Sequence, residues 1–448
     1  MMNKAVRFLF AALAAGLVLS GCADSSRPEA TGKGNIRGVH AIVDAPQAEF
    51  RIEERSLGNI GYKGVTSTIE FDDLTYQFNF DSALPGDTTL RRIASRELTV
   101  VPDTDYIFVL TGTFDDADLL LWESPERQWE AADDTFEASA GHLSPQAGDI
   151  DFYFAAPGTA PVAGEARGTL SFGERLPVFE LAEGDYRVTL TAANDPSTVL
   201  FRSTTLAISA QSSVLFTIHD ADPSITSTIS VRRVNAGGGS TELRDVDSPP
   251  TRLFFHAASG TGNFDAFVND DFANAIVSGL AYGDWTADVP VPAGQSDYTY
   301  TAAGNTGAVL AEEEDLTVPA NSRSTSFLVG APGDVDVVNF VNDRRPVIGT
   351  AKVRLVQVSG NFETVDVYLR PAGTDIADVN ADFPNFQSRL SSDYARLEPG
   401  SYELTVTEQG EKTVITGPVV LDLAAGDVTE LALIDNADPA ELDVIVYD

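Results

Sequence analysis

Apolar and polar residues alternate with a period of two in short runs along most of the chain. Clear examples are residues 186–190 and 402–406, where every second residue is apolar. This alternation is typical of a β-strand with one buried face. Gly, Pro, Asn and Asp separate the runs at strand-like spacing, and no segment after residue 22 shows a sustained helical apolar stripe. The pattern predicts an all-β protein.

The runs recur in a fixed order, which indicates internal repetition. Four segments open on one position, occupied by His40, His142, His256 and Gln357. An acid follows nine residues later in each segment: Glu49, Asp151, Asp265 and Asp366. A strand containing Tyr, a short strand, an acidic turn and a final apolar strand then follow in the same order. These shared offsets predict four tandem copies of one unit.

The copies are expected at residues 36–124, 137–235, 250–342 and 350–448. About seven strands in roughly 95 residues favour an immunoglobulin-like β-sandwich for each copy. With one Cys in the chain, such sandwiches must be stabilised by packing without the immunoglobulin disulfide. The joints between copies are short and polar, so we expect the four sandwiches to form a semi-rigid row.

The unit resembles the DUF4397 family, a bacterial surface domain of unknown function that often occurs in tandem and is often lipid-anchored. The best matching motifs are His40-Ala41, Ala45-Pro46, Asp366-Val367-Tyr368 and Pro399-Gly400-Ser401-Tyr402. The first copy departs from the pattern because no Gly precedes its Tyr, and the fourth because Gln replaces the His. The resemblance implies a β-sandwich and a surface location, and it brings no catalytic residues.

The N-terminus has the pattern of a bacterial lipoprotein signal. Lys4 and Arg7 precede an apolar run over 8–19, which is too short to span a bilayer as a mature helix. The run ends in Leu19-Ser20-Gly21-Cys22, which resembles the lipobox whose Cys is diacylated after cleavage. We therefore expect a signal peptide at 1–21 and lipid attachment, including palmitate, at Cys22.

Residues 22–35 then form the lipidated Cys and a flexible polar stalk. Acyl chains would hold the protein on a membrane without spanning it. Because Ala23 follows the Cys, a Gram-negative cell would be expected to place the protein in the outer membrane, on its periplasmic or surface face.

The composition of the chain excludes several classes of function. The chain has 448 residues, 67 acidic and 29 basic, and a formal net charge of −38. This charge excludes a general nucleic-acid binder, which needs basic patches. The single Cys excludes a disulfide scaffold and a multi-Cys metal site. We interpret the acidity as a solvated surface that keeps an exposed protein soluble.

The candidate chemical groups favour structural roles. Since Gln357 replaces the repeated His and cannot act as a base, we expect that position to serve hydrogen bonding. We expect His219 on the surface, and the four acids nine residues after the repeated position in solvated or backbone-binding turns. No G-x-S-x-G, H-E-x-x-H or P-loop motif is present. No catalytic residue is therefore assigned, and no cofactor is expected.

The acidic turns are the one candidate metal site in the sequence, because closely spaced carboxylates at a domain end can ligate calcium. The calcium candidates are Asp116, Asp118, Asp220, Asp222, Asp334, Asp336 and Asp438.

The sequence thus predicts a lipid-anchored envelope protein without enzymatic activity that acts as a surface binding or structural module. Its partners would be the membrane and an unidentified protein or glycan. Two alternatives stay open. One is an envelope hydrolase with its site in a divergent copy, for which the insert at 157–177 is the most distinctive segment. The other is a calcium-stiffened adhesin or stalk.

Overall fold

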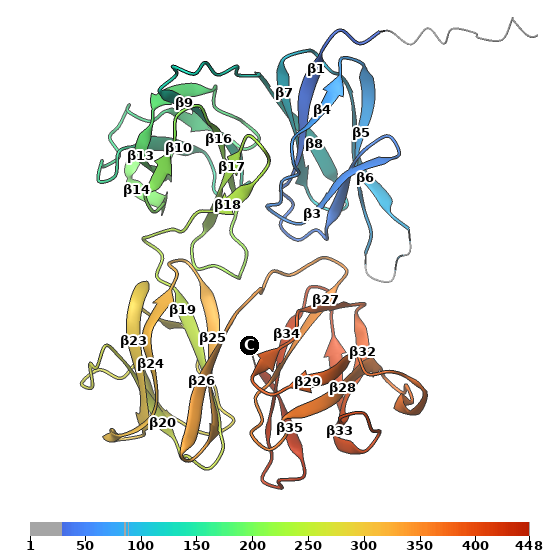
Figure 1. Cartoon of the computed structure of the whole chain (residues 1–448), viewed down its shortest axis with the longest axis vertical. Coiled ribbons are helices and arrows are strands. Elements are labelled where there is room, and N and C mark those ends of the chain that lie inside the picture. The colour runs from blue at the N-terminus through green and yellow to red at the C-terminus, as the bar shows by residue number, and fades with distance from the viewer. Residues whose placement is uncertain (1–28, 85–86, 88, 448) are drawn as a thin grey trace, which may run out of the picture.

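The computed structural model describes residues 29–84, 87 and 89–447, and it is an all-β structure. The one helical element among these residues is a 3-10 turn, η1 (Ile376–Asp378). The strands form eight sheets, which pack in pairs as four β-sandwiches (Figure 1). We number the sandwiches in chain order, with strands within 33–125, 135–242, 251–341 and 351–447. The all-β prediction is confirmed.

Each sandwich has two sheets, called here the inner and the outer sheet. In the first sandwich the inner sheet is β4 (Ile69–Asp72), β1 (Lys33–His40), β7 (Thr104–Gly112) and β8 (Ala117–Pro125), and the outer sheet is β3 (Arg55–Ile60), β2 (Ala48–Ile52), β5 (Thr75–Ser82) and β6 (Arg91–Thr99). In the second the inner sheet is β12 (Phe179–Ala182), β9 (Thr135–Leu143), β16 (Ser213–Asp220), β17 (Ile229–Asn235) and β18 (Ser240–Glu242). Its outer sheet is β11 (Gly168–Leu170), β10 (Ile150–Ala155), β13 (Gly184–Ala192) and β14 (Asp195–Arg202), with β15 (Leu206–Ile208) paired to β13.

The third and fourth sandwiches follow the same plan. In the third the inner sheet is β22 (Val289–Pro290), β19 (Thr251–Ala258), β25 (Arg323–Ala331) and β26 (Asp334–Val341), and the outer sheet is β21 (Val277–Leu280), β20 (Phe264–Val268), β23 (Gly294–Ala302) and β24 (Asn305–Val318). In the fourth the inner sheet is β30 (Leu390–Ser391), β27 (Ala351–Gln357), β34 (Val428–Asp435) and β35 (Leu442–Tyr447), with β31 (Ala395–Leu397) paired to β27. Its outer sheet is β29 (Phe383–Gln387), β28 (Thr364–Pro371), β32 (Gly400–Glu408) and β33 (Val414–Leu423).

Every inner sheet contains one parallel strand pair, formed by the first strand of the sandwich and a strand late in it. The pairs are β1·β7, β9·β16, β19·β25 and β27·β34. The first strand carries the repeated His or Gln, so this position lies at the end of a central strand in all four sandwiches.

The inner sheets are apolar on both faces. One face packs on the outer sheet of its own sandwich, and the other packs on the neighbouring sandwich. Val39, Val109 and Trp122 of the first sandwich form one buried cluster with Leu215 and Val234 of the second. The third and fourth sandwiches share an equivalent cluster, which includes Phe255, Phe327, Val356, Ile434 and Tyr447. Burial on both faces explains why these strands read as continuous apolar runs.

The four sandwiches therefore lie two by two, with the first and second side by side at one end and the third and fourth at the other (Figure 1). The prediction that the four sandwiches form a row is therefore wrong. A row needs inner sheets with one solvated face, whereas these sheets bury their second face against the next sandwich. Short linkers permit either arrangement, and the apolar second face decides between them.

Candidate functional site

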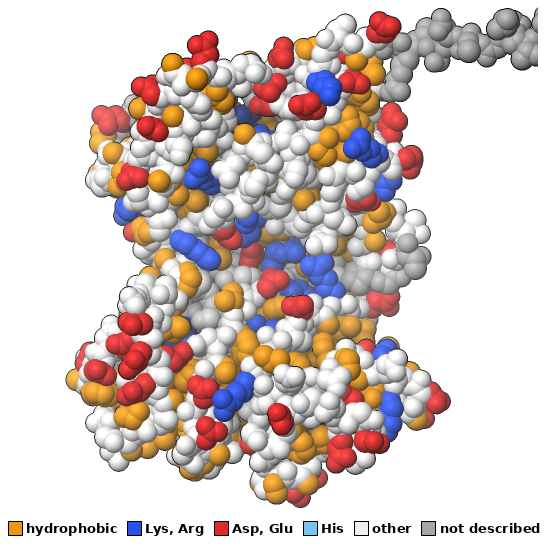
Figure 2. Space-filling model, viewed as in Figure 1, with side chains coloured by type: hydrophobic (Ala, Val, Ile, Leu, Met, Phe, Trp, Pro, Cys, Tyr) orange, Lys and Arg blue, Asp and Glu red, His pale blue; other side chains and the backbone are white. Residues whose placement is uncertain are grey.

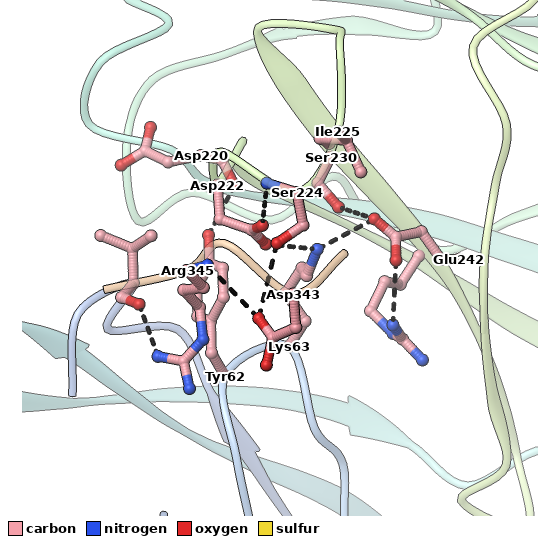
Figure 3. Close-up of polar contacts among 12 residues, drawn as sticks. Tyr62, Lys63, Asp220, Asp222, Ser224, Ile225, Ser230, Glu242, Asp343 and Arg345 are labelled. Atoms are coloured by element: carbon pink, nitrogen blue, oxygen red, sulfur yellow. Dashed lines mark hydrogen bonds and ion pairs between the residues drawn. The ribbon is translucent and has the colours of Figure 1, made fainter. Parts of the chain in front are cut away.

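A cluster of charged side chains lies where the two pairs of sandwiches meet (Figure 3). Lys63, in the loop after β3, extends from the first sandwich to two acids of the second. Its Nζ lies 3.1 Å from Asp222 Oδ2 and 2.9 Å from Glu242 Oε1. The side chains of Lys63 and Asp222 are 9% and 6% exposed, so the ion pair is largely shielded from solvent.

Tyr62 and Arg345 complete this junction. The Tyr62 hydroxyl donates to the Asp220 carbonyl at 2.6 Å, and the Arg345 guanidinium lies 5.8 Å from the centre of the Tyr62 ring. Arg345, in the linker between the third and fourth sandwiches, donates through Nη1 to the carbonyls of Val43 and Ala45 at 2.8 and 3.1 Å. The junction thus joins the first sandwich, the second sandwich and the 3–4 linker.

The charges of the junction are matched internally. Burial alone would raise the pKa of Asp222, but Lys63 and the hydrogen bonds from Ser224 outweigh it, so the pKa lies below its usual value. The pKa of Glu242 is lowered in the same way, with Lys63 and Ser230 overcoming burial. Burial and the nearby acids raise the pKa of Tyr62 well above its usual value. Such a set of ionised, paired groups holds domains together and exposes no free nucleophile or base.

The same tyrosine contact occurs in the other pair of sandwiches. Tyr282 of the third sandwich donates to the Asp435 carbonyl of the fourth at 2.7 Å, as Tyr62 does to Asp220. A Tyr in the corresponding loop of the first and third copies was the available sequence signal for this contact, which was not predicted. Lys63 has no counterpart beside Tyr282, where Gly283 follows.

The repeated His position is structural, as predicted. His40, His142 and His256 are fully buried. In each, Nδ1 accepts from the N–H two residues on and Nε2 lies 2.7–3.0 Å from the carbonyl six residues on. Since a backbone N–H can only donate, the ring is neutral with its proton on Nε2. Gln357 reproduces both bonds, with Oε1 accepting from Ser359 and Nε2 donating to the Phe362 carbonyl, each at 2.7 Å.

Burial lowers the pKa of all these histidines, and that of His40 falls to about 4. The surface position expected for His219 is wrong. It is fully buried, with Nε2 2.9 Å from Thr217 Oγ1 and its ring edge against Tyr62. The loop of the first sandwich covers it, which no local pattern around His219 could indicate. Burial also lowers its pKa well below the usual value.

Three of the four repeated acids bind backbone amides, in agreement with the prediction. Asp265 accepts from the N–H groups of Gly279 and Gly304 at 2.7 and 2.8 Å. Asp366 accepts from the N–H groups of Asn385 in β29 and Gly410 in the β32–β33 turn, and Asp151 accepts from the Asn194 N–H and the Thr169 hydroxyl. Glu49 instead pairs with Arg51 at 2.8 Å. The three Asp side chains each tie an edge strand and a turn to the central strands of their outer sheet.

The calcium candidates do not occupy one repeated site, which corrects the register expected from the sequence. Asp116, Asp118, Asp334 and Asp336 lie at the start of β8 and β26. Asp220 instead ends β16, where it accepts from Ser144, and its counterpart is Asp435, which accepts from Ser359. Asp438 lies in the following turn. The β16–β17 and β34–β35 turns are longer than those of the other copies, so equal offsets fall on different positions.

No group of three or more His, Cys, Asp or Glu side chains that could hold a metal ion occurs among the described residues. Asp222 is engaged by Lys63 and by the Ser224 N–H. Calcium binding stays an untested prediction.

The insert at 157–177 supplies packing contacts. Arg167 donates to the Phe154 carbonyl, and Glu174 accepts from the Ser171 N–H at 2.8 Å. Arg175 extends to Ser139 and Ser124 at the boundary between the first two sandwiches.

Cys22 and the signal segment lie outside the described residues. Within residues 29–84, 87 and 89–447, no helix has the length and apolar character needed to cross a membrane.

A family model matches two regions of the chain, residues 34–153 and 253–368. Its description is a domain of unknown function, DUF4397. Each match starts in the first or third sandwich and ends in the second strand of the sandwich that follows. No curated protein matches the chain. Among solved structures, the chain is similar to the TIE protein of Bacillus anthracis at 11% identity, covering 91% of this chain and 69% of that one, with a TM-score of 0.15.

Proposed function

The chain belongs to the DUF4397 family, and from this premise we propose that it is a lipid-anchored cell-envelope protein whose four sandwiches act as one non-catalytic surface module. The module would bind a protein or glycan partner, or would hold its place in the envelope as a structural element. The lipobox ending in Cys22 supports the anchor, and the family resemblance supports the surface location.

The observation that carries the proposal is the buried junction around Lys63. It adds a polar link between the first and second sandwiches, which already share an apolar interface. Arg345 then attaches the 3–4 linker to the first sandwich. Four sandwiches fixed in this way present a rigid outer surface, which lowers the ordering cost of binding a partner.

Acyl labelling tests the anchor. The wild-type chain and Cys22→Ala are expressed with labelled palmitate in a bacterial host, and membranes are separated from soluble fractions. We expect label and membrane fractionation in the wild type and neither in the variant. Equal labelling of both chains would contradict the anchor.

The non-catalytic role has a separate test. A fragment starting at residue 23, which contains every described residue, is applied to a glycan array and to pull-downs from envelope extracts. Saturable binding without turnover supports the proposal. Turnover of a bound glycan or peptide that is lost on changing one acid would overturn it in favour of a hydrolase.

A further inference from the structure

The core of the third sandwich contains a buried arginine where the other three copies have apolar residues. Arg252 lies on β19 four residues before His256, and its exposed fraction is 1%. The same position, four residues before the repeated His or Gln, is occupied by Ile36, Ala138 and Val353. All three of these side chains are buried in the cores of their own sandwiches. A guanidinium at this position is specific to the third copy.

Polar groups surround Arg252 on the facing strands. Its Nη2 lies 3.4 Å from Glu313 Oε2 and also donates to Asn339 Oδ1. Tyr300 donates to Glu313 at 2.8 Å, and Ser326 donates to Asn339 at 2.7 Å. The strand registers place Phe80 and Phe108 of the first sandwich at the positions of Tyr300 and Ser326. The fourth sandwich has Val406 and Leu431 there.

The arginine keeps unused donors. Its Nε and Nη1 are buried and make no hydrogen bond among the described residues. The guanidinium lies 4.5 Å from the centre of the Tyr298 ring, which contributes a cation–π contact. A buried charge with unpaired donors costs free energy, and an apolar residue at this position would avoid that cost.

Arg252 forms part of the wall of a pocket of about 300 Å³ between the second and third sandwiches. Arg244 and Arg323 also line it, together with apolar side chains that include Ile225, Leu316 and Val318. Arg323 is paired with Asp288, and the one acid in the wall, Glu242, is engaged by Lys63. Arg244 makes no ion pair or hydrogen bond among the described residues.

The pocket is therefore positive in a chain whose net charge is −38. On the face shown in Figure 2, Lys and Arg side chains gather at the waist of the molecule, and Asp and Glu side chains lie mainly toward its two ends.

We propose that this pocket binds a small organic carboxylate with an apolar body, its carboxylate directed to Arg244, while the buried Arg252 adds positive charge behind the wall. The planar guanidinium fork matches the two oxygens of a carboxylate. Hydrogen bonds between charged groups are stronger than those between neutral groups. The apolar wall would cover the rest of the ligand, and 300 Å³ is at the lower end of small-molecule sites. This site does not depend on the lipid anchor.

The test is calorimetric titration of the fragment starting at residue 23 with 3-phenylpropionate, octanoate, 3-phenylpropionamide and inorganic phosphate. We expect saturable binding of at least one of the two carboxylates. We expect the amide and phosphate to bind about ten-fold or more weakly, because the first lacks the charge and the second the apolar body.

Two variants locate the site. Arg244→Gln removes the charge that faces the ligand at the partly buried rim, and Arg252→Ile introduces the residue of the first copy and removes the charge behind the wall. Each is expected to weaken carboxylate binding about ten-fold or more. Arg370→Gln, which removes a charge on β28 of the fourth sandwich, serves as the control and is expected to leave binding unchanged. If the circular-dichroism spectrum of Arg252→Ile shows that this variant does not fold, the binding measured for Arg244→Gln is the test of the site.

The proposal is overturned if neither carboxylate titrates to saturation at millimolar concentration. It is also overturned if acid and amide bind alike, if phosphate binds as tightly as the carboxylates, or if the folded pocket variants bind like the control. Each of these results leaves the acyl-labelling test of the anchor unaffected.

Discussion

Lys63 and Asp222 are 159 residues apart in the chain, yet their side chains form a buried ion pair at 3.1 Å between two different sandwiches. Replacing Lys63 by Met keeps the length of the side chain and removes its charge. Asp222 would then be buried without its ion-pair partner, while Glu242 would keep only Arg232 at 3.7 Å. Removal of one partner of a buried pair costs about 3 kcal/mol. We expect the unfolding midpoint in denaturant, followed by tryptophan fluorescence, to fall accordingly.

The matched control is Lys33→Met. Lys33 pairs with Glu70 at 3.3 Å, but both side chains are more than half exposed. An exposed pair contributes between zero and about 1 kcal/mol, so this variant should unfold close to the wild type. Equal midpoints for the two variants would show that the Lys63 pair does not stabilise the junction.

His40→Gln should flatten the acid side of the stability profile. Burial lowers the pKa of His40 from 6.5 to about 4 in the folded chain. Above pH 6.5 the ring is neutral in both states, and as the pH falls toward 4 the unfolded chain takes up a proton that the folded chain does not. The folded state therefore loses up to about 3 kcal/mol over this window.

Gln cannot take up that proton, and Gln357 shows that it can make both hydrogen bonds of the position. We expect the variant to match the wild type at pH 7 within about 1 kcal/mol and to exceed it near pH 4. Denaturant unfolding measured at several pH values between 4 and 7 checks this. Parallel loss of stability in both chains would contradict the assigned role of His40.

The part of the fold that sequence could predict is local. Alternation with period two in residues such as 402–406 is produced by a strand and one buried face, so the all-β class followed from it. The equivalence of His40 and Gln357 also followed, because each side chain offers an acceptor together with an N–H donor. These inferences need only the residues within one copy.

The arrangement of the copies and the junction could not be predicted in this way. Runs such as residues 107–110 are apolar on both faces, which signals double burial but does not identify the covering surface. Lys63 and Asp222 have no common spacing and no counterparts in the other copies. Arg252 was readable from the sequence as an exception at a repeated apolar position, although its pocket required the second sandwich to be placed.

Gly141→Ala should loosen the contact between the first two sandwiches. A Cβ at Gly141 would clash with the Trp122 ring, which is itself fixed by a 3.0 Å hydrogen bond from Nε1 to the Gly173 carbonyl. The ring must move and give up that bond, at a cost of about 1–3 kcal/mol. We expect a lower melting temperature and a red-shifted tryptophan emission.

Gly237→Ala is the control for this substitution, since a Cβ there would meet no atom within 4 Å. It should melt and fluoresce like the wild type. Equal melting temperatures for Gly141→Ala and the control would mean that the packing of Trp122 does not stabilise the interface between the first and second sandwiches.

Asn321→Gly should loosen the contact between the two pairs of sandwiches. Asn321, in the third sandwich, accepts through Oδ1 from the N–H groups of Thr226 and Ser227 in the second, at 2.9 and 2.7 Å. Its φ is 58°, a left-handed conformation that glycine adopts without strain, so the substitution removes the amide alone. Two N–H groups lose their acceptor, at about 2 kcal/mol in total. Hydrogen exchange at residues 226 and 227 should accelerate while exchange within β19 and β25 stays slow.

Asn194→Gly tests the backbone effect separately, because Asn194 has φ 61° and its exposed side chain makes no hydrogen bond among the described residues. Unchanged exchange at 226 and 227 in Asn321→Gly, relative to Asn194→Gly, would mean that the sandwiches are held together without this amide.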